Sequence, residues 1–298
     1  MTITAGMVKE LREKTGVGMM ECKKALEENA GDLDKAVLWL RERGLSRAAK
    51  KADRVAAEGI VKVAIAADNK SGVVVEFNCE TDFVSKNEDF MKFADDVAKL
   101  ALAQKVSDVD ALKSLKLADG ETVEGRMTTL IAKLGENMKV RRLGYLSSAK
   151  GTVAGYTHMG GKIGSLILLD GAEGPEVQEL GRDLAMHAAA AGPRYLKSEE
   201  VDASEIETEK ELGRKALLEQ GKPENMWEKI LVGQVNKFYK EIVLIEQGFV
   251  KDPGQSIKQV VAEKGKGAQL TAFQLFKLGE GIEKKKENFA DEVAAVLR

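Results

Sequence analysis

One order of predicted elements occurs twice along this chain, and that repetition restricts the fold more than any other feature of the sequence. Residues 60–80 (IVKVAIAADNKSGVVVEFNCE) have the pattern of two strands around a DNKSG turn, and residues 87–104 have that of an amphipathic helix. Residues 151–174 again give a strand, a glycine turn and an apolar strand, and a second amphipathic helix follows over 175–192. Two such segments, near 59–103 and 151–192, predict an α+β protein in which each half has a small antiparallel sheet covered by helices.

The first 45 residues predict three short helices that form a compact module. Thr4 is placed to cap the first helix and Asp32 to cap the third. Gly31 is predicted to stop the second helix and Gly44 to end the third. The charged, alanine-rich stretch SRAAKKADRVAAEG that follows predicts a helical linker with a solvated face, because no aromatic residues are interleaved with its basic ones.

The last hundred residues predict mainly helices. VDASEIETEKELGRKALLEQ and ENMWEKILVGQVNKFYKEI are two long helical patterns joined by GKP, which is typical of a helical hairpin. Its first arm is strongly charged, so we expect the hairpin to project from the core. SIKQVVAEKG and AQLTAFQLFKLG then predict a helix and a strand, and ENFADEVAAVLR predicts a final amphipathic helix with Phe289, Val293 and either Val296 or Leu297 on one face.

Charge and composition exclude several classes of function. The length of 298 residues allows two or three domains, and a formal net charge of -2 gives no basic field that would attract nucleic acid or a membrane. Two cysteines cannot form a disulfide framework, and the sequence has neither a Cys/His cluster nor a phosphate-binding glycine motif. No stretch approaches the ~20 apolar residues of a membrane span. We therefore expect a cytoplasmic protein without a cofactor or metal, and we do not expect an enzyme.

The stretch NCETDFVSKN (78–87) places an acidic and a large apolar side chain together where an apolar strand ends. Asp82 and Phe83 fit three roles: a catalytic acid in a pocket, a helix cap with a core anchor, or an apolar projection aimed at another protein. In the second role Asp82 would cap the helix that begins near Glu88, and Phe83 would lie in the core. Glu80 and Asp82 could also form an acid–base pair, although no neighbouring nucleophile or histidine supports that.

Six stretches, taken in order, resemble the family of translation elongation factor Ts. They are VKELREKTGVGMMECKKALEENAGDLDKAV, NCETDFVSKN, THMGGKIGSLILL, LAMHAAAAGPRYL, EQGFVKDP and LGEGIEKKKENFADEVA, and together they extend over essentially the whole chain. Each is modest alone, but their order and spacing are specific. One departure concerns the stiffness of a loop, because the family commonly has proline where this chain has Gly248.

The resemblance implies a guanine-nucleotide exchange factor for elongation factor Tu that binds both its GDP-bound and its nucleotide-free forms. It implies a three-helix, UBA-like module and linker over 1–54, core subdomains over 55–148 and 149–278, and a C-terminal module over 279–298. The second core subdomain would carry the projecting hairpin as an insertion over about 199–240. Neither a direct nucleic-acid partner nor a membrane partner is implied.

The resemblance also assigns roles to individual residues. The Asp and Phe that match Asp82 and Phe83 intrude near the Mg²⁺ site of the GTPase, and Thr81 and Val84 would shape the same loop. His158, Arg12, Met19, Met20, Leu134 and Gly135 are the further residues expected to contact elongation factor Tu. Of the two methionines, one is also expected to lie in the core.

His187 lies on an apolar helix face and is predicted to be structural.

Two other interpretations compete with that of an exchange factor. A helical adaptor bound to an unrelated α+β domain would lack exchange activity, and the joint occurrence of TDFV and HMGGKIG argues against it. An enzyme with an Asp-based site is disfavoured by the scarcity of His and Cys.

Overall fold

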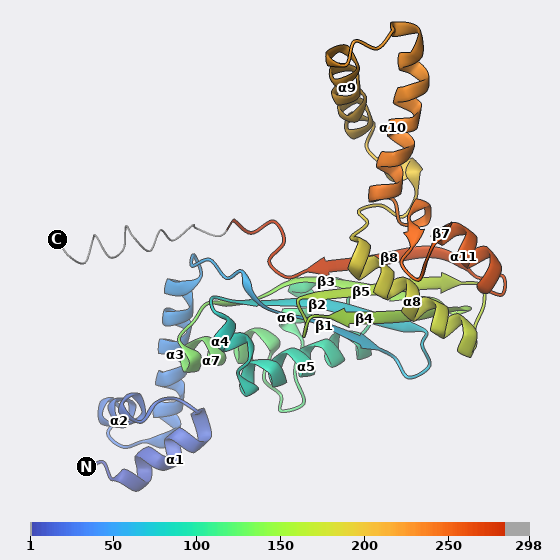
Figure 1. Cartoon of the computed structure of the whole chain (residues 1–298). Helices are drawn as coiled ribbons and strands as arrows, with labels where there is room; N and C mark the ends of the chain where they lie inside the picture. Colours follow the sequence, from blue (N-terminus) through green and yellow to red (C-terminus); the bar gives the residue numbers. More distant parts are fainter. Residues whose placement is uncertain (1, 284–298) are drawn as a thin grey trace. The chain divides into compact units, whose positions relative to one another are not determined.

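The structure is a computed structural model that describes residues 2–283, and it combines helices with small antiparallel sheets, as the α+β prediction requires (Figure 1). The chain divides into two compact units. Among the described residues, unit 1 contains 2–62, Val75–Leu143 and 277–283, and unit 2 contains Val63–Val74 and Gly144–Phe276.

The N-terminal part of unit 1 consists of helices α1 (Ala5–Thr15), α2 (Met19–Glu28) and α3 (Leu33–Lys51). Both predicted caps are present: the Thr4 side chain accepts a hydrogen bond from the Met7 N–H, and the Asp32 side chain accepts one from the Lys35 N–H. The three helices enclose one apolar cluster, formed by Val8, Leu11, Val17, Cys22, Ala25, Leu26, Ala36 and Leu40.

The prediction that Gly44 ends the third helix was wrong, because α3 continues to Lys51. Gly44 is buried, and a Cβ added there would lie 3.4 Å from the Cβ of Ala132 on α7 (Val123–Leu134). The glycine therefore serves close packing between α3 and α7, and sequence alone does not distinguish such a contact from a helix stop.

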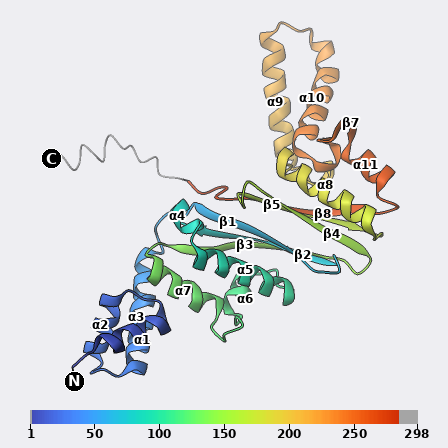
Figure 2. The ribbon, with the colours of Figure 1, turned by 60° about the horizontal axis from the view of Figure 1, so that its bottom comes forward.

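The rest of unit 1 contains the two ends of the first predicted hairpin, whose middle part, Val63–Val74, belongs to unit 2. Strands β1 (Glu58–Ile65), β2 (Ser71–Cys79) and β3 (Met138–Ser147) lie in the order β1-β2-β3. Three helices besides α7 follow β2, namely α4 (Asp82–Ser85), α5 (Glu88–Ala103) and α6 (Val109–Ser114). Helices α5 and α7 lie on the same face of this sheet (Figures 1 and 2), where Phe77 of β2 meets Phe93 of α5 edge to face at 6.0 Å between ring centroids.

The buried carboxylate of Glu76, on β2, binds the backbone at Gly279. The Glu76 side chain is fully buried, and its oxygens accept hydrogen bonds from Arg141 Nη1 (3.0 Å), Arg142 Nε (2.5 Å) and the Gly279 N–H (2.8 Å). Burial by itself raises the pKa of Glu76, but these hydrogen bonds outweigh it and hold that pKa below its ordinary value. The carboxylate is therefore ionised and paired inside unit 1.

Unit 2 contains the second copy of the element order. Strands β4 (Gly151–His158) and β5 (Ile163–Asp170) pair antiparallel from Gly151↔Asp170 to His158↔Ile163, and β8 (Gln269–Lys277) lies next to β5. Helix α8 (Pro175–Ala191) packs on β4 and β5, and its Leu180 and Leu184 join the apolar core of the unit. Both predicted copies of strand, turn, strand and amphipathic helix are thus present.

The predicted helical hairpin is also present in unit 2, as α9 (Ala203–Glu219) and α10 (Trp227–Ile242). Both views show these helices side by side, standing away from the sheet of their own unit (Figures 1 and 2). Short 3₁₀ turns occur at Ser198–Glu200, Glu224–Met226 and Leu244–Glu246. The small strands β6 (Gly248–Phe249) and β7 (Asp252–Ser256) precede helix α11 (Ile257–Lys264).

Within residues 2–283, no helix is long and apolar enough to span a membrane. The amphipathic helix predicted over 287–298, with Phe289, Val293 and either Val296 or Leu297 on one face, lies outside the described residues.

Candidate functional site

The loop after β2 presents Phe83 to solvent on a single turn of helix. Thr81 caps α4, its hydroxyl accepting a hydrogen bond from the Val84 N–H, and the Ser85 hydroxyl donates to the Asp82 carbonyl. The Val84 side chain is buried, whereas Phe83 is 82% exposed. An aromatic side chain exposed to this degree, next to a residue that is buried in the core, marks a candidate contact surface.

The reading of Asp82 and Phe83 as a helix cap with a core anchor was wrong. Asn87 caps α5, its side chain accepting hydrogen bonds from the Asp89 and Phe90 N–H groups. Phe83 lies outside the core, because its side chain is 82% exposed, whereas the neighbouring Val84 is buried.

The two carboxylates of this stretch are engaged separately. Asp82 forms an exposed ion pair with Lys86, with 2.7 Å between the carboxylate and Nζ. Glu80 accepts a hydrogen bond from the Asn137 N–H at 2.6 Å, and its other oxygen lies 3.6 Å from Arg54 Nη1. Each carboxylate thus has its own structural partner, which does not favour an acid–base pair.

The loop that follows α7 lies directly beside this turn. Gly135 ends α7 with a left-handed φ of 82°, and its carbonyl accepts a hydrogen bond from Lys51 Nζ. The next residue, Glu136, accepts hydrogen bonds from both the N–H and the hydroxyl of Thr81. The predicted residues Leu134 and Gly135 are therefore brought next to Thr81–Val84, which we call the TDFV turn, inside unit 1.

Sequence reasoning missed Glu136 and Asn137, which make these connections. Their partners, Thr81 and Glu80, lie 55 and 57 positions away along the chain. No pattern of neighbouring residues in the sequence predicts such hydrogen bonds. The clue present in the sequence is the pair of polar residues directly after the helix-ending glycine of AKLGEN.

The N-terminal module presents the other predicted residues of unit 1. Arg12 is exposed in the last turn of α1, and Met19 and Met20 at the start of α2 are 47% and 77% exposed. The expectation that one methionine lies in the core was wrong, because both side chains are exposed and other residues, Leu11 and Leu26 among them, form that core. Two exposed methionines at a helix start give an adaptable apolar surface.

His158 belongs to unit 2, which is described by itself. It ends β4, is exposed, and stacks on Tyr156 with ring centroids 5.9 Å apart and 3.2 Å between Tyr156 Oη and His158 Nδ1. The following Met159 is 69% exposed and has a left-handed φ of 50°. Sequence reasoning did not single out Met159, although a large apolar residue before two glycines at a hairpin tip is visible in the sequence.

His187 is structural, as predicted. Its ring is buried, with Nε2 3.0 Å from Gln247 Oε1, and its Nδ1 accepts a hydrogen bond from the Val250 N–H at 3.2 Å. Burial lowers the pKa of His187, and the hydrogen bond to Gln247 opposes this only in part. The ring is therefore neutral, donating through Nε2 and accepting at Nδ1.

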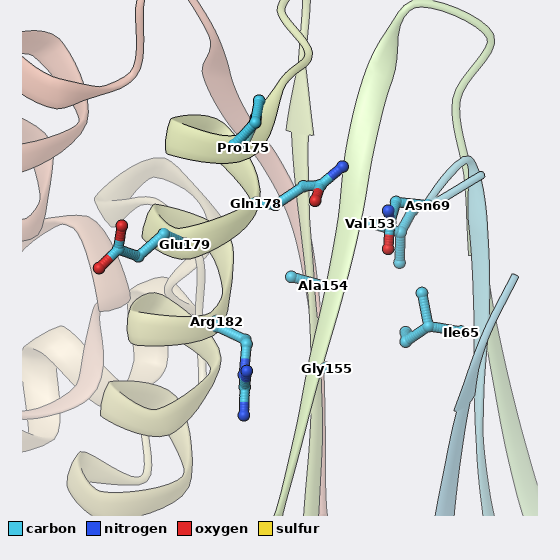
Figure 3. A pocket seen from close by; sticks show the side chains of 9 residues that line it. All are labelled: Ile65, Asn69, Val153, Ala154, Gly155, Pro175, Gln178, Glu179 and Arg182. Atoms are coloured by element: carbon cyan, nitrogen blue, oxygen red, sulfur yellow. The ribbon is translucent and has the colours of Figure 1, made fainter. Parts of the chain in front are cut away.

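An open pocket of about 540 Å³ lies in unit 2 over β4 (Figure 3). Figure 3 shows Gln178 and Arg182 of α8 at one side of the pocket, with Asn69 and Ile65 at the other. Its lining residues are Ile65, Asn69, Val153, Ala154, Gly155, Pro175, Gln178, Glu179 and Arg182. None of the predicted site residues lines it.

Known proteins similar to this chain agree on one family. The family model described as "Elongation factor TS" matches residues 80–280. Elongation factor Ts of Clostridium botulinum (strain Alaska E43 / Type E3) is 50% identical over 300 residues, which cover 99% of each chain. Elongation factor Ts of Clostridium perfringens (strain SM101 / Type A) is 50% identical over 98% of each chain, and that of Magnetococcus marinus is 47% identical over 100% of each.

The chain belongs to the elongation factor Ts family. The predicted resemblance is thus confirmed, and membership assigns the chain to the elongation stage of protein biosynthesis. The matched region contains the TDFV turn, the loop at 134–135 and His158, whereas Arg12, Met19 and Met20 precede it and are covered by the full-length relatives.

Proposed function

We propose that this protein is a guanine-nucleotide exchange factor for elongation factor Tu, and that it acts by binding, without catalysing a covalent reaction. Membership of the elongation factor Ts family supports the partner. The proposal rests mainly on the exposure of Phe83. Its aromatic side chain is 82% exposed, whereas Val84 next to it on the same turn is buried. We further propose that the protein works in the cytoplasm and needs neither a nucleic-acid nor a membrane partner.

Exchange requires only that the factor prefer the empty GTPase. A nanomolar nucleotide is held by about 12 kcal/mol. If the factor binds the nucleotide-free form more tightly than the GDP-bound form, linkage weakens GDP by the same ratio. The Mg²⁺ ion of the partner is a sensitive point, because it requires near-octahedral ligands at about 2.0–2.1 Å and a small displacement of those ligands removes much of its binding.

In this proposal the TDFV turn acts on that Mg²⁺ site. Phe83 inserts as the apolar group, and Asp82 is the polar group that repositions its neighbours. Val84 anchors the turn in unit 1 and Thr81 caps it, so that the ring is presented without a large loss of conformational freedom on binding.

The remaining predicted residues would supply binding energy outside the Mg²⁺ site. Arg12, Met19 and Met20 are exposed on the N-terminal module, and we propose that they contact a helix of elongation factor Tu. Leu134 and Gly135 would add contacts beside the TDFV turn. His158 would contact the GTPase from unit 2.

The test is the release of a fluorescent GDP analogue from elongation factor Tu at catalytic concentrations of this protein. Wild type should accelerate release strongly. Phe83→Ala should reduce the acceleration by at least about 30-fold, the loss expected for an interface anchor that contributes ~2 kcal/mol. Phe83→Leu, which keeps an apolar group, should retain more of the acceleration than Phe83→Ala.

Val250→Ala is the matched control, because Val250 is also a large apolar residue that is 43% exposed, and it has no role in the proposal. It should accelerate release like wild type. If Phe83→Ala exchanges nucleotide at the wild-type rate, the insertion mechanism is wrong. If wild type itself gives no acceleration, the exchange function is wrong.

A further inference from the structure

Two loops of unit 1 exchange carboxylate hydrogen bonds in both directions. Glu136 Oε2 accepts from the Thr81 N–H at 2.9 Å, and Glu136 Oε1 accepts from the Thr81 hydroxyl at 2.6 Å. In the opposite direction, Glu80 Oε1 accepts from the Asn137 N–H at 2.6 Å. Each loop thus supplies one carboxylate and one backbone N–H, and we call Glu80, Thr81, Glu136 and Asn137 the clasp.

The clasp also holds the end of α3. The Asn137 side-chain amide is buried and donates to the carbonyls of Ala52 (3.2 Å) and Arg54 (2.8 Å). Arg54 Nη1 lies 3.6 Å from the second oxygen of Glu80. The clasp therefore joins the end of α3, the last helix of the N-terminal module, to the turn that carries Phe83 and the loop that carries Gly135.

Helix α4 needs such support. It has only four residues, and a helix of one turn is unstable by itself because nucleation costs more than its few hydrogen bonds return. Its first residue follows Thr81 directly, so the bonds from Thr81 to Glu136 fix where the turn begins. The direction in which Phe83 points depends on that starting position, while Val84 fixes only the depth of the turn.

We infer that Glu136, together with Glu80 and Asn137, positions the Phe83 ring at a set distance and direction from the N-terminal module. This inference rests on the proposed exchange function. The clasp residues act through Phe83 and the surface of α1 and α2, so they are positioning residues and not contact residues. A partner bound by the N-terminal module then meets Phe83 already in place, which lowers the entropic cost of inserting it.

The experiment combines two measurements on the full chain. Hydrogen exchange of the free protein, followed by mass spectrometry, reports the amides of residues 80–87, including the Thr81 N–H that Glu136 accepts from. The release of fluorescent GDP from elongation factor Tu is then measured over a range of concentrations of this protein, which separates the maximal rate from the half-saturating concentration.

Glu136→Ala should speed amide exchange in residues 80–87 and lower the maximal rate of GDP release about tenfold, with less than a threefold change in the half-saturating concentration. Glu136→Gln should recover most of the rate, because its carbonyl still accepts from the Thr81 N–H and its amide donates to the Thr81 hydroxyl. Asp89→Asn is the matched control: it weakens the Asp89–Lys133 ion pair, which also joins the α5 start to α7, and should leave both measurements unchanged.

Each contrary result has a distinct meaning. Unchanged amide exchange in Glu136→Ala would overturn the clasp itself. Faster amide exchange with an unchanged maximal rate would overturn the positioning role. Equal losses in Asp89→Asn and Glu136→Ala would show that any weakening of this region has the same effect, and would also overturn it. If wild type does not accelerate GDP release, the proposed function fails and the positioning role fails with it.

Discussion

The two copies of the strand–turn–strand–helix order differ most in the connection between the second strand and the helix. In unit 2, β5 reaches α8 through residues 171–174, where Gly171 and Gly174 have left-handed φ values of 93° and 117°. In unit 1, β2 reaches α5 through residues 80–87, which contain α4 and the exposed Phe83. The same framework thus carries a plain turn in one copy and a candidate contact site in the other, as expected when function resides in connections and stability in the sheet and helix.

The copies also bury different ionisable side chains. Unit 1 buries Glu76 in its charged form, paired with Arg141 and Arg142. Unit 2 buries His187 in its neutral form, between Gln247 and the Val250 N–H. The two units should therefore lose stability in different ranges of pH.

The largest change in the free energy of unfolding of either unit should come from substituting the glycine at the start of its hairpin. A Cβ at Gly59 would lie 2.0 Å from the Phe77 carbonyl oxygen, and Gly59 has a φ of 133°. A Cβ at Gly151 would lie 2.6 Å from the Leu169 carbonyl oxygen, without a left-handed φ. Gly59→Ala should destabilise unit 1 by about 3 kcal/mol or more, because overpacking and strain add, and Gly151→Ala should destabilise unit 2 by about 2 kcal/mol.

Urea unfolding followed by amide exchange in β2 and in β5 would measure the two costs separately. Gly120→Ala is the control, since its φ of 87° is left-handed but no atom lies within 4 Å of the added Cβ. It should cost only about 1 kcal/mol, the strain alone. Equal costs for Gly59→Ala and Gly120→Ala would show that the close backbone contact has no effect.

The parts of the fold that sequence predicted are those with a local cause. The caps at Thr4 and Asp32 follow from side chains that reach a backbone N–H three residues away, and the hairpins follow from apolar strands around short turns. Gly44 misled the prediction because its role is set by Ala132, far away in sequence.

The candidate site was harder to predict from the sequence than the fold. Local pattern favours a core position for a phenylalanine after a buried strand, and only the family resemblance pointed Phe83 outward. The hydrogen bonds between Thr81 and Glu136 could not be predicted from the sequence. They join two loops 55 positions apart, and each loop has the sequence of an ordinary polar turn.

A smaller effect should come from Glu76→Gln. The change keeps the volume but removes the charge that Arg141 and Arg142 face, and it leaves an amide N–H₂ near those donors. Unit 1 should lose about 2 kcal/mol at pH 7, the scale of hydrogen bonds to a charged group. Amide exchange in β2 should rise, while exchange in β5 stays at the wild-type level.

The pH dependence of the Glu76 contribution follows from its lowered pKa. The stabilisation is complete above the ordinary glutamate value of about 4.5 and is lost as pH falls through the lower pKa of the folded state. Wild type and Glu76→Gln should therefore differ by a constant amount between pH 7.5 and 5.5, and converge below about pH 4.5. Convergence already near pH 6 would contradict the lowered pKa.

The smallest effect, and the sharpest contrast between the units, should come from His187. Its folded pKa lies below the ordinary value of 6.5, so the unfolded state takes up a proton first as pH falls. Unit 2 should lose up to about 1.4 kcal/mol per pH unit below about pH 6.5, over a range in which the Glu76 contribution to unit 1 is constant. Amide exchange in β5 compared with β2, measured at pH 7.5 and 5.5 and corrected for intrinsic rates, would detect this difference.

His187→Gln should be less stable than wild type at pH 7.5, because glutamine fills the buried site less well, yet it should lose less stability on acidification. His158→Gln is the matched control, since His158 is the other histidine of the chain and is exposed. It should keep the wild-type pH dependence in both units. If His187→Gln and wild type lose the same stability between pH 7.5 and 5.5, the neutral buried histidine is not the acid-sensitive group of unit 2. The two copies would then differ in their connections but not in their response to pH.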